Sequence, residues 1–256
     1  MTDIEPTKLD KILDELITER IIEQHIVEWG YNYNIFSDEL KRYIYWNLSD
    51  HEKLKLHKKA ADTIFEIYGD RVNNIMDELV YHLVKSNNNN SALKLVFEEA
   101  DKIDNKYSLK AIVLWEKAYT IVRDDDIENR LKILYVLTDI FTLKGNNEKL
   151  NIYLNELYDL SIESKTLEYE IKARFYRTEI FLRTNQLDDL RIEIDALEKV
   201  SRENRMLEGI ICSSIAKGRM YLYTNNLESI EDIMNETIEL SLENGLNKYL
   251  GSIYMI

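Results

Sequence analysis

Apolar positions in the second half of the chain recur with helical spacing and with a long period. Aligning the segments 143–150, 182–190 and 222–230 places Leu143, Leu182 and Leu222 at steps of 39 and 40 residues. Apolar or small residues also repeat at internal offsets of four and three, in the sets Ala111/Trp115/Ala118, Leu150/Leu154/Leu157, Leu190/Ile194/Leu197 and Ile230/Met234/Thr237. Such offsets mark one face of a helix, and a step near forty fits two helices with two turns. The pattern therefore predicts stacked helical hairpins.

The same periodicity predicts helices over 128–144, 147–161, 165–184, 187–201, 203–224 and 227–243, with a further helix beginning near Leu246. The final stretch, LNKYLGSIYMI, would open a helix that has neither a partner nor the polar outer face of a terminal repeat. We therefore expect the last repeat to be truncated.

The N-terminal segment shows a different pattern. A helix is predicted from Thr7 to about Ile22, followed by alternating positions over 23–37 that indicate a short β-hairpin around a Gly-Tyr-Asn turn. Ser37 or Asp38 would cap the next helix, and Ser49 or Asp50 would cap a longer helix over 51–68. The order helix, hairpin, helix is typical of the tail of a winged-helix unit.

Composition supports a helical protein. Among 256 residues, 45% are hydrophobic. One proline and seven glycines are few for the tight turns that connect the strands of a sheet. No apolar run approaches the length of a membrane span, and the first ten residues lack the regions of a signal peptide. The single cysteine, Cys212, suits a reducing compartment, so we expect a soluble, cytoplasmic protein without membrane contact.

The net charge of −14 opposes non-specific binding to nucleic acid or anionic lipid. The densest basic run, Lys53, Lys55, Lys58 and Lys59, alternates with apolar residues and is interpreted as the solvated face of an amphipathic helix. The first predicted helix is itself net negative, which argues against insertion into a DNA groove.

Two resemblances follow from these patterns. The repeat sets, with Gly218 and Tyr221 at small and aromatic positions, resemble tetratricopeptide repeats in a long form. The run 36–70, with the segments 78–84 and 91–103, resembles the junction of STAND-class signalling ATPases, including LuxR-type regulators with an AAA ATPase module. The matching residues are Phe36, Leu40, Arg42, Tyr45, Leu56, His57, Ala60, Ala61, Tyr81 and His82.

The second resemblance implies an ATPase module before residue 1. It also implies that His57 packs against the wing and hydrogen-bonds a backbone group. Relatives often carry His where this chain has Asp38, a residue that senses bound ADP in them. Because an aspartate would repel a diphosphate, we expect Asp38 to cap helix 38–48 instead.

The sequence shows no pattern of catalytic residues. A phosphate-binding GxxxxGK[ST] loop is absent, and the four histidines form no metal-ligand spacing. Cys212 is expected to be a buried thiol, the carboxylates are spread over helix faces, and most of the 17 tyrosines are interpreted as core. We therefore expect neither an enzyme nor a cofactor or metal site.

The predicted fold class is all-α: a right-handed α-solenoid of tetratricopeptide-like hairpins, preceded by a winged-helix-like unit with a short β-hairpin. The predicted domains are a winged-helix-like unit (1–50), connecting helices (51–104) and repeats (105–256). The expected function is a protein-binding scaffold or sensor arm of a larger signal-transduction or transcription-regulating ATPase. The alternative is a stand-alone winged-helix DNA-binding regulator with a peptide-binding repeat domain. The oligomeric state is left open.

The predicted binding surface lies on the first helix of each hairpin, because stacking superposes equivalent positions into a strip. Its residues are Lys144, Lys172, Glu179, Arg183, Arg219 and Tyr223. The four cations would make the strip locally positive and attract an acidic peptide, a partner helix or a carboxylate. The alternative is that these side chains are ordinary solvated positions of amphipathic helices.

Overall fold

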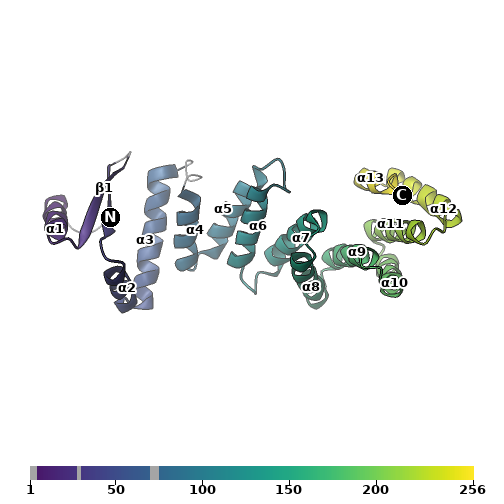
Figure 1. The fold of residues 1–256 in the computed structure, drawn as a ribbon, viewed down its shortest axis with the longest axis horizontal. Coiled ribbons are helices and arrows are strands. Elements are labelled where there is room, and N and C mark those ends of the chain that lie inside the picture. The colour runs from purple at the N-terminus through teal and green to yellow at the C-terminus, as the bar shows by residue number, and fades with distance from the viewer. Residues whose placement is uncertain (1–4, 28–29, 70–74) are drawn as a thin grey trace. The chain divides into compact units, whose positions relative to one another are not determined.

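The structure is a computed structural model that describes residues 5–27, 30–69 and 75–256. Within these ranges the chain forms thirteen α-helices and one two-stranded antiparallel sheet, drawn in Figure 1. The predominantly helical fold with a small N-terminal sheet is as predicted. The chain divides into two compact units, Met1–Glu99 and Ala100–Ile256.

The N-terminal unit contains the predicted helix, hairpin and helices, although the first helix ends at Thr18 and not near Ile22, which begins the first strand. Its elements are α1 (Pro6–Thr18), β1 (Ile22–Val27), β2 (Gly30–Ile35), α2 (Asp38–Asn47), α3 (Asp50–Tyr68), α4 (Met76–Lys85) and most of α5 (Asn89–Asp101). α1 contacts β1, β2 contacts α2, and α3 packs along α4.

The strand register corrects one prediction about the hairpin. Val27 pairs with Gly30, and Ile26 pairs with Tyr31, so Gly30 and the two residues after it belong to β2. The predicted Gly-Tyr-Asn turn is therefore wrong, because the two-residue alternation of this segment continues into the strand pairing. Residues 28–29 lie outside the described residues.

Serine residues cap α2 and α3. The Ser37 hydroxyl accepts a hydrogen bond from the Leu40 N–H at 3.3 Å, whereas Asp38 is the first residue of the helix. The expectation that Asp38 is the cap is therefore wrong: Ser37 has the extended backbone of a capping residue, and Asp38 contributes its charge to the first turn instead. Ser49 caps α3 in a capping box with Glu52.

The second unit is a succession of antiparallel helices, each lying beside the one before it (Figure 1). They are α6 (Leu109–Ile121), α7 (Ile127–Lys144), α8 (Asn147–Glu163), α9 (Leu167–Arg183), α10 (Leu187–Glu203), α11 (Leu207–Tyr223) and α12 (Glu228–Glu243), followed by the 3-10 turn η2 (Asn247–Tyr249) and α13 (Leu250–Ile253). α9 also contacts α7 and α11. Of the twelve apolar or small residues in the predicted sets, all but Ile230 are buried, which confirms the predicted helix faces.

Left-handed residues end these helices at intervals of twenty positions. The residues with positive φ are Gly145, Lys165, Asn185, Arg205, Asn225 and Gly245. After five of them the next N–H bonds a carbonyl five residues back at 2.8–2.9 Å, for example Met206 N to Ser201 O, which is the Schellman closure. α9 and α11 accordingly begin later than predicted, at Leu167 and Leu207, because Lys165 and Arg205 have left-handed backbones.

Two glycines let α11 approach its neighbours closely. A Cβ at Gly209 would lie 2.1 Å from Ser201 Oγ on α10 and 3.1 Å from Ile171 Cδ1 on α9. A Cβ at Gly218 would lie 2.6 Å from Cε of Met234 on α12. The packing of α11 therefore requires the absence of a side chain at Gly209, whereas at Gly218 the flexible end of Met234 can shift aside.

We expect Gly209→Ala to lower the free energy of unfolding by about 1–3 kcal/mol, the usual cost of overpacking. The loss outweighs the gain in helix propensity because Ser201 is fully buried and its hydroxyl already donates to Leu197 O at 2.6 Å, so it cannot move aside. Urea unfolding followed by circular dichroism measures the change. Gly251→Ala is the matched control, since a Cβ there meets nothing within 4 Å; equal destabilisation by both variants would contradict the packing argument.

Replacing a left-handed lysine or arginine with glycine should stabilise the stack. A left-handed backbone at a residue other than glycine lowers the free energy of unfolding by roughly 1–2 kcal/mol. Glycine removes this strain, but its more flexible unfolded chain cancels about 0.4–1 kcal/mol of the gain. Lys165→Gly and Arg205→Gly should each therefore raise the free energy of unfolding by about 0.5–1 kcal/mol. Lys199→Gly, in the exposed middle of α10, should lower it by about 1 kcal/mol. A loss of stability in all three variants would show that the turns carry no strain.

Candidate functional site

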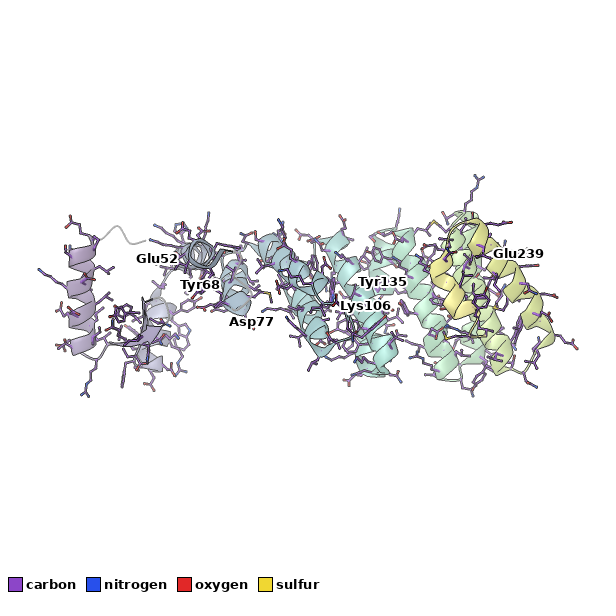
Figure 2. All side chains as sticks on the ribbon, turned by 90° about the horizontal axis from the view of Figure 1, so that it is seen from above. Glu52, Tyr68, Asp77, Lys106, Tyr135 and Glu239 are labelled. Atoms are coloured by element: carbon purple, nitrogen blue, oxygen red, sulfur yellow. The ribbon has the colours of Figure 1, made fainter. Side chains whose placement is uncertain are left out.

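The contacts of α9 with α7 and α11 place the first helices of successive hairpins side by side, as the repeat pattern predicts. Aromatic and charged side chains gather where α7 and α9 meet. We call Tyr135, Asp139, Tyr169, Lys172 and Tyr176 the tyrosine face. All five are partly exposed, so these tyrosines are not the fully buried core that the sequence suggested. Figure 2 labels Tyr135 among the side chains of this part of the chain.

Lys172, a predicted groove residue, lies within this face. Its Nζ is 2.5 Å from Glu168 Oε1, 4.4 Å from the ring centre of Tyr135 and 4.9 Å from that of Tyr169. Tyrosine rings attract a cation through their negative faces. The ammonium group is thus held by one carboxylate and two rings, and it does not project freely into solvent.

Asp139 is the polar centre of the tyrosine face. Its carboxylate accepts hydrogen bonds from Lys106 Nζ at 2.7 Å, the Tyr107 hydroxyl at 3.1 Å and the Tyr176 hydroxyl at 2.8 Å. Burial, followed by the Asp139 charge, raises the pKa of Tyr176, so its hydroxyl remains a donor. Burial opposes the charge of Lys106, but the hydrogen bonds and charges of Asp139 and Tyr107 together outweigh it and raise the pKa of Lys106 to about 12.

The other predicted groove residues connect successive hairpins. Arg219 of α11 forms an ion pair with Glu179 of α9. Arg183 donates from Nη1 to the Thr142 carbonyl of α7 at 2.9 Å, and Tyr223 donates to Asn185 Oδ1 at 3.2 Å. These contacts join residues 38 to 41 positions apart, close to the repeat length of the alignment. They occupy the side-chain groups that were expected to face a ligand.

Lys144 differs from the other three predicted cations. It is exposed in the last turn of α7, and no described residue forms an ion pair or hydrogen bond with its side chain. Within the predicted strip, Lys172 and Arg219 pair with carboxylates and Arg183 donates to a carbonyl, so Lys144 is the one cation of the strip without a side-chain ion pair or hydrogen bond to a described residue. Binding of a partner to this strip stays a prediction.

Cys212 of α11 is buried, as expected. Burial raises the pKa of its thiol to about 12, so the reactive thiolate is scarcely populated at neutral pH. Among the residues that the structure describes, no group of three His, Cys, Asp or Glu side chains is placed to hold a metal ion. None of the described helices is both long and apolar enough to cross a bilayer.

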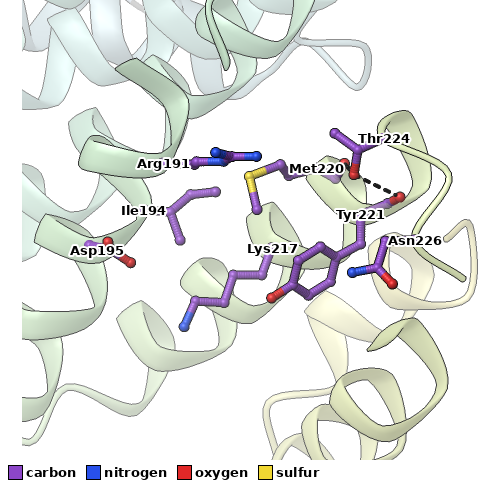
Figure 3. Close-up of a pocket in the computed structure, with 8 residues that line it drawn as sticks. All are labelled: Arg191, Ile194, Asp195, Lys217, Met220, Tyr221, Thr224 and Asn226. Carbon is purple, nitrogen blue, oxygen red and sulfur yellow. Dashed lines mark hydrogen bonds between the residues drawn. The ribbon is translucent and has the colours of Figure 1, made fainter. Parts of the chain in front are cut away.

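A pocket of about 420 Å³ lies between α10 and α11, drawn in Figure 3. Its lining comes from two facing helices and the turn after α11: Arg191, Ile194, Asp195, Lys217, Met220, Tyr221, Thr224 and Asn226. It shares no residue with the tyrosine face or with the predicted strip. No sequence motif marks it, because the lining residues of α10 and α11 come together only through helix packing.

The N-terminal unit contains a histidine pair. His57 Nδ1 of α3 lies 2.8 Å from His82 Nδ1 of α4, and His57 Nε2 lies 3.0 Å from the Tyr45 hydroxyl of α2. The resemblance implied a backbone partner for His57, and the structure instead gives it two side-chain partners. The pair is 25 residues apart in sequence, so only the packing of α3 on α4 shows it.

Two neutral imidazoles satisfy this geometry only when one Nδ1 carries a hydrogen and the other accepts it. Burial, then the positive charges of His82 and Lys85, lowers the pKa of His57. Two cations lie near the pair on its own helices: Lys53 of α3, over the Tyr45 ring, and Lys85 of α4, over the Tyr81 ring. Both oppose a further positive charge and so favour a neutral His57.

Comparisons with known proteins gave no match: none to a family model, none to a curated protein and none to a solved structure. The geometry described above is therefore the basis for the functional argument.

The histidine pair should make the N-terminal unit acid-sensitive. Because the pKa of His57 is lowered in the folded state, the unfolded chain binds more protons below about pH 6.5, and stability falls as the pH drops through that value. Hydrogen exchange of α3 and α4 between pH 7.5 and 5 should show loss of protection. His57→Gln should remove this pH dependence, whereas the control His51→Gln, at an exposed position of α3, should retain it. Identical pH profiles for the two variants would contradict the role of the pair.

Proposed function

We propose that this chain is a non-catalytic protein-binding scaffold or sensor arm, which binds a protein or peptide on the first helices of its stacked hairpins. The observation that carries the proposal is the lateral contact of α9 with α7 and α11, which joins three helix faces into one surface. Tyrosine is enriched at protein interfaces because it combines a large apolar ring with a hydroxyl. The tyrosine face supplies this chemistry.

The finer architecture of the proposal is a right-handed solenoid of tetratricopeptide-like repeats. The forty-residue period supports it, as does the burial of Ala111, Trp115 and Ala118, which matched the second-helix motif best. Arrays of this kind bind extended partners along their stacked surface. In this reading the polar contacts between hairpins hold the surface rigid for a partner, with Lys144 available to an acidic group.

The wider proposal is that the chain is part of a larger STAND-like signalling ATPase, with a winged-helix-like unit over α1 to α2. The predicted order of helix, hairpin and helix supports this assignment. Tyr43 and Trp46 of α2 are 65% and 73% exposed, and α1 and α2 contain no buried residue. Clustered exposed aromatic side chains are typical of surfaces that contact another protein. The first helix also carries more acidic than basic residues, which favours a protein partner over DNA.

Site-specific photo-cross-linking tests the binding surface. A benzophenone side chain placed at Lys144 or Tyr223, at the ends of α7 and α11, should capture a partner protein from lysate. The same group at Lys199, an exposed position of α10, is the control. Equal capture from all three positions, or no capture from the first two, would contradict the proposed surface. ATP hydrolysis by the purified chain would contradict the non-catalytic assignment.

A further inference from the structure

The pocket between α10 and α11 combines a rigid apolar floor with a polar rim. Ile194 and Met220 are 1% and 8% exposed, and they belong to one apolar cluster with Leu190 and Ala216. Their positions are therefore fixed by packing whether or not the pocket is filled. The volume of about 420 Å³ lies within the range of ligand-binding pockets. An apolar group that enters it would be removed from water against this floor.

The rim offers one unpaired charge of each sign. Lys217 is already neutralised by Glu198, whose pKa is lowered chiefly by that contact and whose second oxygen pairs with Arg202. Arg191 and Asp195 are exposed, and neither forms an ion pair with any described residue. They are one helical turn apart, but a base four residues before an acid is the weaker orientation for pairing.

The remaining polar groups of the rim are mainly donors. The Tyr221 hydroxyl forms no hydrogen bond within the described residues, and Asn226 uses only its carbonyl oxygen, which accepts from Ser229 Oγ at 3.4 Å. Together with the Arg191 guanidinium they can donate to a carboxylate or to peptide carbonyl groups. Asp195 is the one charged acceptor of the rim that lacks a partner, and it can accept from a peptide N–H.

We propose that this pocket binds a peptide segment in which an apolar side chain stands next to an acidic residue. The apolar side chain fills the space over Ile194 and Met220, and the neighbouring carboxylate pairs with Arg191. Asp195 of α10 and Asn226 of the turn after α11 line the pocket (Figure 3) and bind the peptide backbone. The inference rests on the proposed protein-binding function and places a second, specificity-determining contact outside the tyrosine face.

The test uses a capped hexapeptide with a central Leu-Glu pair flanked by Gly and Ser, titrated into the full chain with methyl-labelled isoleucine and methionine. Saturable shifts of the Ile194 and Met220 methyl signals are expected. Arg191→Glu should weaken the affinity about tenfold or more, the usual effect of losing a charge-assisted contact. A peptide with Gln in place of Glu should bind the unsubstituted protein more weakly than the Glu peptide does. The same change should not weaken binding to Arg191→Glu, so the difference measures the contact between Arg191 and the peptide carboxylate.

Lys199→Glu, the same charge change on α10 outside the pocket, should leave the affinity within about twofold, since exposed distant charges contribute little. The absence of saturable Met220 shifts, or an affinity that is insensitive to Arg191→Glu, would overturn the proposal that the pocket binds this peptide. Shifts confined to isoleucine methyl signals of α7 and α9 would also overturn it while supporting the proposed function. Conversely, pocket binding without photo-cross-linking at Lys144 or Tyr223 would refute the proposed binding surface on the first helices and leave the pocket in place.

Discussion

The stack depends on one constraint: successive helices must end at regular intervals of twenty residues. A helix of this unit buries one apolar face, and that face meets its neighbour only if the chain reverses in register. The left-handed residues from Gly145 to Gly245 provide this reversal, and the Schellman hydrogen bonds fix it. With the reversals fixed, Gly209 and Gly218 can bring α11 close enough to α10 and α12 for the cores to interlock.

Polar contacts across the stack then determine which surface groups remain available. Glu193 of α10 is 6% exposed and accepts hydrogen bonds from Arg174 and Arg177 of α9, whose guanidinium groups lie over the Tyr158 ring of α8. Such a buried carboxylate requires both partners, because an unpaired charge is costly away from water. The same use of charge between repeats explains why Arg183 and Arg219 contact neighbouring hairpins rather than solvent.

The structure contains two candidate binding surfaces and one histidine contact between helices. The tyrosine face presents aromatic rings, with the Lys172 cation paired to Glu168 and the Tyr176 hydroxyl bonded to Asp139, which suits broad contact with a protein surface. The α10–α11 pocket keeps an unpaired Arg191 and Asp195, which suits a specific local contact. The histidine pair, with His57 buried and His82 partly exposed, joins α3 to α4 and links the packing of the N-terminal unit to its protonation state.

The sequence by itself determined the helices, their forty-residue period and their buried faces, because periodicity and turn residues are local properties of the chain. It also identified equivalent positions such as Arg183 and Tyr223 correctly as neighbours of the preceding repeat. Tertiary structure alone decided that these side chains would be occupied by contacts between hairpins, and that His57 would contact His82. A side chain's partner depends on what packing brings within hydrogen-bond distance, and residues 25 to 41 positions apart carry no local signal of that contact.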